Sequence, residues 1–183
     1  MKVLFVNAAF REESRTLRLA EHYIGRYEQV DRVELGDMEL SPFNRSILKE
    51  YNQAVSTHCF DAQMFELAKQ FAEAEEIVIA APFWNYGMPA VLHTYLEYVC
   101  TQGITFDMSR DGRYVSLCHA KKIVYITTAG GPIPEKDCAF GYLETIAKAF
   151  FGAPEMVYYK ADCLDVYGVD VEEKLQMVMR IMR

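Results

Sequence analysis

The sequence predicts a three-layer α/β sandwich, with helices covering both faces of a five-stranded parallel sheet of strand order 2-1-3-4-5. Short, continuously apolar runs recur along the chain, as expected of strands buried on both faces. Longer segments with apolar residues at helical spacing separate these runs, and this alternation is typical of doubly wound sheets. The length of 183 residues, 51% of them hydrophobic, predicts one domain spanning residues 1–183.

The first half of the chain is expected to provide two strands. Residues 3–6 are wholly apolar and form a buried strand, and the helix that follows at residues 14–27 has apolar residues every three or four positions. Residues 32–35 alternate polar and apolar, which indicates a strand at the edge of the sheet. Residues 36–57 are predicted to be irregular because they contain a Ser-Pro-Phe-Asn turn sequence. Helix resumes at residues 59–74.

The second half is expected to provide three more strands. Residues 76–81 and 123–127 are continuous apolar runs suited to the centre of the sheet, and residues 156–159 complete it. Residues 103–120 form a long excursion with an Arg-Asp-Gly-Arg turn. The remaining helices are expected at residues 89–100, 140–151 and 171–182.

Composition excludes several classes of function. The net charge is −7 and the basic residues form no stripe, so nucleic acid and anionic membrane surfaces are poor partners. The five cysteines show no CxxC spacing and the four histidines no ligand spacing, so neither a disulfide framework nor a metal site is expected. No apolar run approaches ~18 residues and no leader is expected, which favours the reducing cytoplasm.

The loop after the first strand has the composition of an anion site. In doubly wound sheets, ligands bind beyond the carboxyl ends of strands one and three. Arg11 and Arg15 would offset the charge of a phosphate, while Ser14 and Thr16 add hydroxyl donors beside the amides of a helix start. The alternative is that Ser14 serves only as a helix N-cap. The chain contains neither GxGxxG nor GxxxxGK[ST], which argues against a standard dinucleotide fingerprint and against P-loop nucleotide hydrolases.

Two further loops at the same edge suit a flat, conjugated ring. After the third strand come Pro82, Phe83, Trp84, Asn85, Tyr86 and Gly87, and after the fourth come Thr128, Ala129, Gly130 and Gly131. Aromatic side chains can stack on a ring, and paired glycines let backbone amides approach a ligand closely. A core role for the aromatics and a plain turn at the glycines remain the alternatives. Together, the three loops predict an FMN site with phosphate at one end and the ring system at the other.

Four segments resemble those of the flavodoxin-like NAD(P)H:quinone oxidoreductases, FMN-dependent azoreductases and NADPH-dependent FMN reductases. Residues 8–16 are similar to their GSPRxxSxT loop, with matches at Arg11, Ser14 and Thr16. The other similar segments are residues 82–92 with P-x-[YW]-x-[FY]-x-[MI]-P-x-x-L, residues 103–106 with GxTF, and residues 126–131 with ITSRGG. The order is kept across nearly the whole chain, so the set is specific.

This resemblance implies a flavodoxin-like fold with FMN phosphate at Ser14, Arg15 and Thr16. It also implies that the isoalloxazine lies against residues 83–87 and 128–131, and that the protein is a homodimer packed partly through the helix after Pro89. The chain departs from the family at Ala8 and Ala9, which lack the usual loop serine, and at His93 and Glu97, where Lys and Asp are usual.

The resulting hypothesis is an FMN-dependent oxidoreductase. It would take a hydride from NAD(P)H and pass two electrons to a quinone, an azo compound or a similar flat acceptor by a ping-pong mechanism. Hydride transfer needs no side-chain acid or base, so no catalytic residue is nominated. The alternatives are a flavodoxin-type electron carrier and a binding protein without catalytic activity on the same fold.

Overall fold

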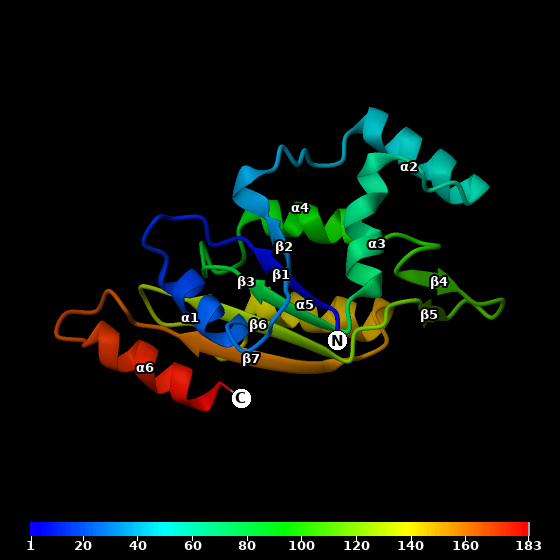
Figure 1. The fold of residues 1–183 in the computed structure, drawn as a ribbon. Helices are drawn as coiled ribbons and strands as arrows, with labels where there is room; N and C mark the ends of the chain where they lie inside the picture. Colours follow the sequence, from blue (N-terminus) through cyan, green and yellow to red (C-terminus); the bar gives the residue numbers. More distant parts are fainter. Residues whose placement is uncertain (183) are drawn as a thin grey trace.

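A computed structural model describes residues 1–182 and shows a central parallel sheet between two layers of helices (Figure 1). The sheet order is β2-β1-β3-β6-β7. Its strands are β1 (Val3–Asn7), β2 (Asp31–Glu34), β3 (Glu76–Ala80), β6 (Lys122–Thr128) and β7 (Glu155–Ala161). All four pairings are parallel, so the predicted order 2-1-3-4-5 is confirmed for the five core strands.

The two faces of the sheet carry separate clusters of buried side chains. Helices α1 (Arg15–Ile24) and α6 (Val171–Ile181) cover one face, where Leu19 and Leu175 pack with Phe5. Three helices lie on the other side, namely α3 (Glu66–Glu73), α4 (Ala90–Val99) and α5 (Cys138–Phe150). Successive side chains of a strand point to opposite faces, which is why continuous apolar runs are required in β1 and β3.

The segment at residues 36–57 corrects the sequence analysis, because the prediction of irregular chain was wrong. A short 3-10 helix covers Leu35–Asp37, and α2 covers Arg45–Thr57. The Asn44 side chain accepts hydrogen bonds from the Ser46 and Ile47 amides, so the supposed turn residue begins a helix. No residue of α2 is fully buried, but Ile47, Tyr51 and Val55, which recur at helical spacing, are half-buried.

Two other segments are refined by the structure. The helix expected from residue 59 begins later, with a short 3-10 turn (Gln63–Phe65) before α3. The excursion at residues 103–120 contains an antiparallel hairpin, β4 (Phe106–Met108) with β5 (Tyr114–Ser116), closed at the predicted turn. Within the described residues, no helix combines the length and apolarity needed to cross a bilayer.

Candidate functional site

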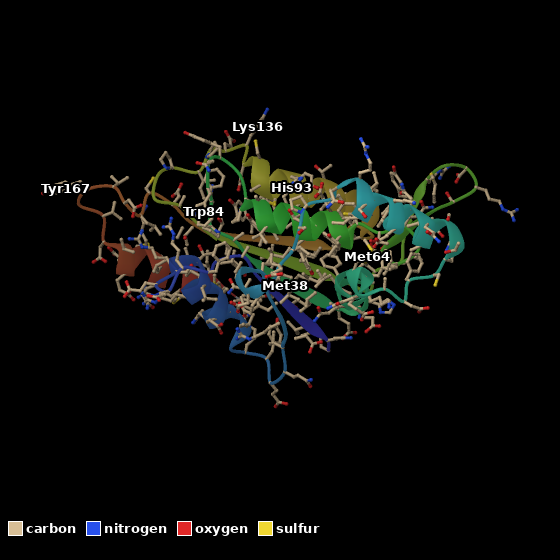
Figure 2. The ribbon with its side chains drawn as sticks, turned by 90° about the horizontal axis from the view of Figure 1, so that it is seen from above. Met38, Met64, Trp84, His93, Lys136 and Tyr167 are labelled. Atoms are coloured by element: carbon tan, nitrogen blue, oxygen red, sulfur yellow. The ribbon has the colours of Figure 1, made fainter. Side chains whose placement is uncertain are left out.

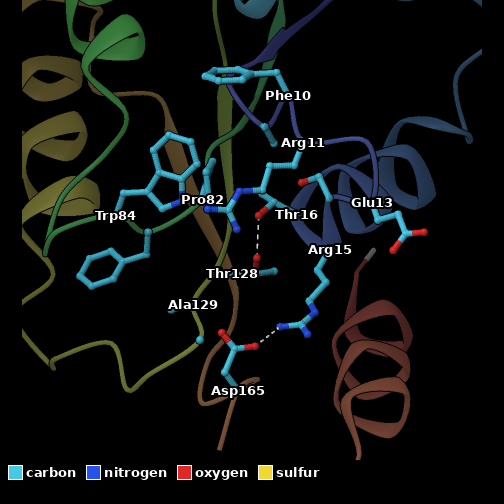
Figure 3. A pocket seen from close by; sticks show the side chains of 14 residues that line it. Phe10, Arg11, Glu13, Arg15, Thr16, Pro82, Trp84, Thr128, Ala129 and Asp165 are labelled. Atoms are coloured by element: carbon cyan, nitrogen blue, oxygen red, sulfur yellow. Dashed lines mark hydrogen bonds and ion pairs between the residues drawn. The ribbon is translucent and has the colours of Figure 1, made fainter.

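A hollow of about 440 Å³ opens at the carboxyl ends of β1, β3 and β6 (Figure 3). Volumes of this size are typical of small-molecule sites. It is lined by Ala9, Phe10, Arg11, Glu13, Ser14, Arg15, Thr16, Pro82, Phe83, Trp84, Thr128, Ala129, Gly130 and Asp165. The three loops singled out in the sequence therefore meet at one place.

Four of the predicted residues lie outside this main hollow. Asn85, Tyr86 and Gly131 line a smaller neighbouring hollow of about 280 Å³, which shares Phe83, Ala129 and Gly130 with the first. Gly87 instead lines a groove beside α4, together with Trp84, Asn85, His93 and Tyr142, among others. The aromatic loop thus separates the main hollow from this groove, and Trp84 borders both.

The first wall is the turn between β1 and α1, and buried Asn7 holds it in shape. Its side-chain amide donates to Glu34 Oε2 at 2.6 Å, and its Oδ1 accepts from the Ala9 amide at 2.8 Å. Ser14 caps α1 by accepting from the Leu17 amide at 3.2 Å, and it also lines the hollow. The first helical turn places backbone donors at this end, where an anion is stabilised by the helix dipole.

Thr16 joins the first wall to the third. Its hydroxyl lies 2.6 Å from that of Thr128 at the end of β6, and both residues are buried. Either hydroxyl can donate in this pair, so Thr16 keeps its own hydrogen for a ligand when Thr128 is the donor. This hydrogen bond links the first loop to the third.

The two arginines of the first loop also have partners. The Arg11 guanidinium lies 5.3 Å from the centre of the Trp84 ring, over its face. Arg15 Nη1 lies 2.6 Å from Oδ1 of Asp165, a residue of the loop after β7 (Figure 3). Asp165 was missed by the sequence analysis, although the loop after a fifth parallel strand necessarily reaches the same edge of the sheet.

The second wall is a tight hairpin at residues 84–87. The amides of Trp84 and Gly87 each donate to the other's carbonyl, at 3.0 and 2.9 Å. Asn85 and Tyr86 both adopt left-handed backbone conformations, with φ of 51° and 61°, which is uncommon for tyrosine and costs conformational energy. The strained tip leaves the Tyr86 side chain 71% exposed beside the smaller hollow.

Phe10 is a second lining residue that the sequence analysis missed. Its ring meets the Trp84 ring edge-on, with centroids 5.9 Å apart. It rests on Gly36, where an added Cβ would come within 2.7 Å of the Phe10 Cβ. Only its position directly before Arg11 could have indicated it.

The third wall follows β6 and is bonded to its neighbours on both sides. The Phe83 amide donates to the Thr128 carbonyl at 3.0 Å, and the Cys163 amide donates to the Gly131 carbonyl at 2.9 Å. An added Cβ at Gly131 would meet no atom within 4 Å, so this glycine faces open space. The four loops form one connected rim.

The chemistry of the lining favours binding over side-chain catalysis. Arg15 and the helix-start amides lie at one end, and the Trp84 indole lies at the other with the Arg11 guanidinium over its face. The lining contains no histidine or cysteine, and the described residues contain no group of three metal-ligating side chains. The hollow suits a ligand that carries its own reactivity.

Comparison with known proteins identifies the family. A family model described as flavodoxin-like fold matches residues 1–176. An FMN-dependent NADH:quinone oxidoreductase 2 of Clostridium acetobutylicum is 37% identical over 185 residues, which cover 93% of this chain and 90% of the relative. The chain belongs to this family. A second member, from Coprothermobacter proteolyticus, is 35% identical over 192 residues, which cover 98% of this chain and 94% of the relative.

Solved structures agree with this assignment to the FMN-dependent NADH:quinone oxidoreductase family. An azoreductase crystal structure from Bacillus anthracis matches with a TM-score of 0.84 at 28% identity, over 98% of this chain and 95% of that one. The resemblance inferred from the sequence and the flavodoxin-like fold are both confirmed, and the protein is an oxidoreductase.

Proposed function

We propose that this oxidoreductase binds FMN in the hollow, accepts a hydride from NAD(P)H and passes two electrons to a quinone, azo compound or similar flat acceptor. One observation carries the proposal, namely a single hollow that has Arg15 and a helix start at one end and the Trp84 indole, with the Arg11 guanidinium over its face, at the other. A phosphate monoester and an aromatic ring at opposite ends of one ligand match these two ends.

The residues present fit FMN. Ser14, Arg15 and Thr16 would hold the phosphate together with the amides of the first turn of α1, and the Arg11 guanidinium would reach it from the Trp84 side. The ring would lie against residues 82–87 and 128–131, extending into the smaller hollow. Gly131 faces open space there, so its backbone is accessible to a ligand.

The protein's part in the reaction is to bind and orient. Bound FMN supplies the capacity to accept a hydride and release two electrons, and the chain needs no acid or base for that step. We propose that donor and acceptor occupy the same exposed face in turn, which gives ping-pong kinetics. The hairpin at residues 84–87 would limit access from the side of α4.

The test is a purified, FMN-supplemented sample assayed for NADH and NADPH oxidation with a benzoquinone. We expect a yellow protein with rapid turnover and parallel lines in double-reciprocal plots. A sample that stays colourless after supplementation would contradict FMN binding, and intersecting lines would contradict the ping-pong scheme. One-electron transfer with no nicotinamide oxidation would instead indicate a flavodoxin-type carrier.

The assembly and location follow the same proposal. We propose one domain over residues 1–183 that forms a homodimer partly through α4, where a groove of about 860 Å³ is lined by Pro42, Met88 and Tyr142, among others. All five cysteines are free thiols in the described chain, which supports a reducing cytoplasm. Sedimentation of the purified protein tests the dimer.

A further inference from the structure

The hollow contains a carboxylate close to where the proposed function requires a phosphate. Asp165 lines the hollow, and its Oδ1 lies 2.6 Å from Arg15 Nη1 (Figure 3). Arg15 is one of two cations in the lining, so half of the positive charge available to a phosphate already faces an anion.

The position of Asp165 is held by the backbone around it. Its amide donates to the Gly130 carbonyl at 2.9 Å, and the Leu164 amide donates to the Ala129 carbonyl at 3.1 Å. An added Cβ at Gly130 would lie 2.1 Å from Asp165 Oδ2, so the missing side chain of Gly130 makes room for this carboxylate. The fourth loop is therefore built against the third with the acid facing Arg15.

The other charged groups of the lining do not replace this pair. The carboxylate of Glu13 turns away from Arg11, Trp84 and Asp165 in Figure 3. Arg11 lies over the Trp84 face and makes no ion pair within the described residues. Asp165 is therefore the acid that acts directly on the phosphate end.

We propose that Asp165 competes with the cofactor's phosphate group for Arg15, and so sets how strongly the site prefers a phosphorylated flavin over an unphosphorylated one. This inference rests on the proposed function. A dianion approaching Arg15 meets repulsion from Asp165, whereas a neutral ligand tail does not. Removing the negative charge while keeping the side-chain shape should strengthen binding of the phosphorylated form alone.

A second ion pair provides a matched control. Arg18 Nη2 lies 2.6 Å from Glu172 Oε1, again between α1 and the C-terminal part of the chain. Arg18 follows Arg15 by one helical turn, both pairs are partly exposed, and neither Arg18 nor Glu172 lines the main hollow. Glu172→Gln removes the same charge from the protein at a place outside the site.

The experiment is a titration of FMN and of riboflavin, each followed by quenching of flavin fluorescence, against the wild type, Asp165→Asn, Asp165→Ala and Glu172→Gln. We expect both Asp165 variants to bind FMN roughly fivefold more tightly, a size typical of one partly exposed charge. Riboflavin affinity should stay unchanged in all variants, and Glu172→Gln should bind FMN like the wild type. The gain should shrink at high ionic strength.

Each other outcome is informative. Equal or weaker FMN binding by both Asp165 variants, with wild-type binding intact, overturns the inference and leaves the proposed function standing. An equal gain for FMN and riboflavin also overturns it, because the phosphate would then play no part. A wild type that binds neither flavin overturns the proposed function, and the inference with it.

Discussion

The two edges of the central sheet treat charge in opposite ways. At the amino edge, the Glu76 carboxylate is buried with three donors around it. The hydroxyls of Tyr23 and Tyr27 donate to it at 2.8 and 2.6 Å, and Lys122 Nζ lies at 3.0 Å. Burial is the main cause that raises the pKa of both tyrosines, and their hydrogen bonds to Glu76 raise it further. Both side chains therefore stay neutral and act as donors.

At the carboxyl edge, the charged groups surround an open hollow instead of each other. The ion pair of Arg15 with Asp165 has side chains 39% and 69% exposed, and Arg11 faces a ring. Figure 2 shows Trp84 at this edge, with Tyr167 farther out at the end of the fourth loop. Buried polar groups that hydrogen-bond to one another stabilise the fold, whereas charged groups exposed to solvent are available to bind a ligand.

The largest effect is expected at the amino edge. Glu76→Ala leaves Lys122, the buried Tyr23 hydroxyl and the half-buried Tyr27 hydroxyl without their acceptor, and we expect a loss of about 3 kcal/mol in the free energy of unfolding. Urea denaturation measures it, with Glu73→Gln at an exposed site as the control. A loss no larger than that of the control would remove the distinction between the two edges.

The next effect is expected at the carboxyl edge and concerns binding. Trp84→Ala removes the indole that lies against Phe10 and Arg11, and we expect the Kd for FMN to rise roughly thirtyfold, or about 2 kcal/mol. Flavin fluorescence titration measures it, and Tyr167→Ala, which removes a fully exposed ring, should change nothing. Unchanged affinity in Trp84→Ala would place the ring of the cofactor elsewhere.

A smaller effect is expected at the hydroxyl pair of Thr16 and Thr128, which lines the hollow and is also buried. Thr16→Val leaves the Thr128 hydroxyl without its partner in a buried place and should cost about 1 kcal/mol of stability. Replacing both threonines by valine should be nearly neutral, because no unsatisfied hydroxyl then remains. Denaturation of the two single variants and the double variant measures the coupling, and simple additivity would contradict it.

The smallest effect is expected at the exposed pair of Arg18 and Glu172. The Arg18 guanidinium lowers the pKa of Glu172 to about 2. The pKa of Glu172 in the folded state is below its ordinary value of 4.5. The ion pair therefore stabilises the fold fully above pH 4.5, and this stabilisation is lost as pH falls toward 2. The urea midpoint of Glu172→Gln should therefore lie slightly below that of the wild type at neutral pH and converge with it in acid. A difference independent of pH would exclude this ion pair as its source.

The sheet could be predicted because its signal is local. Continuous apolar runs at β1, β3 and β6 mark central strands, and handedness rules leave few orders for them. α2 was missed because Asn44 suits a turn as well as a helix cap, and the turn sequence outweighed the helical spacing of Ile47, Tyr51 and Val55.

The site was predictable where one loop carries several telling residues together. The loops of Ser14 and Trp84 could be placed beside each other because loops that follow parallel strands meet at the carboxyl ends of those strands. Asp165 could not be placed by composition, since a single acid in a surface loop is common and its meaning depends on Arg15 across the hollow. The hydrogen bond between Thr16 and Thr128 could not be predicted for the same reason, because it depends on how segments 112 residues apart pack together.

The bond between the Thr16 and Thr128 hydroxyls spans 112 positions of the chain, and it sets the spacing of two walls before any cofactor arrives. The conformational entropy of these two walls is consequently lost when the protein folds and not when the ligand binds. The site is therefore preorganised for the phosphate-bearing chain of FMN, which favours fast, reversible association.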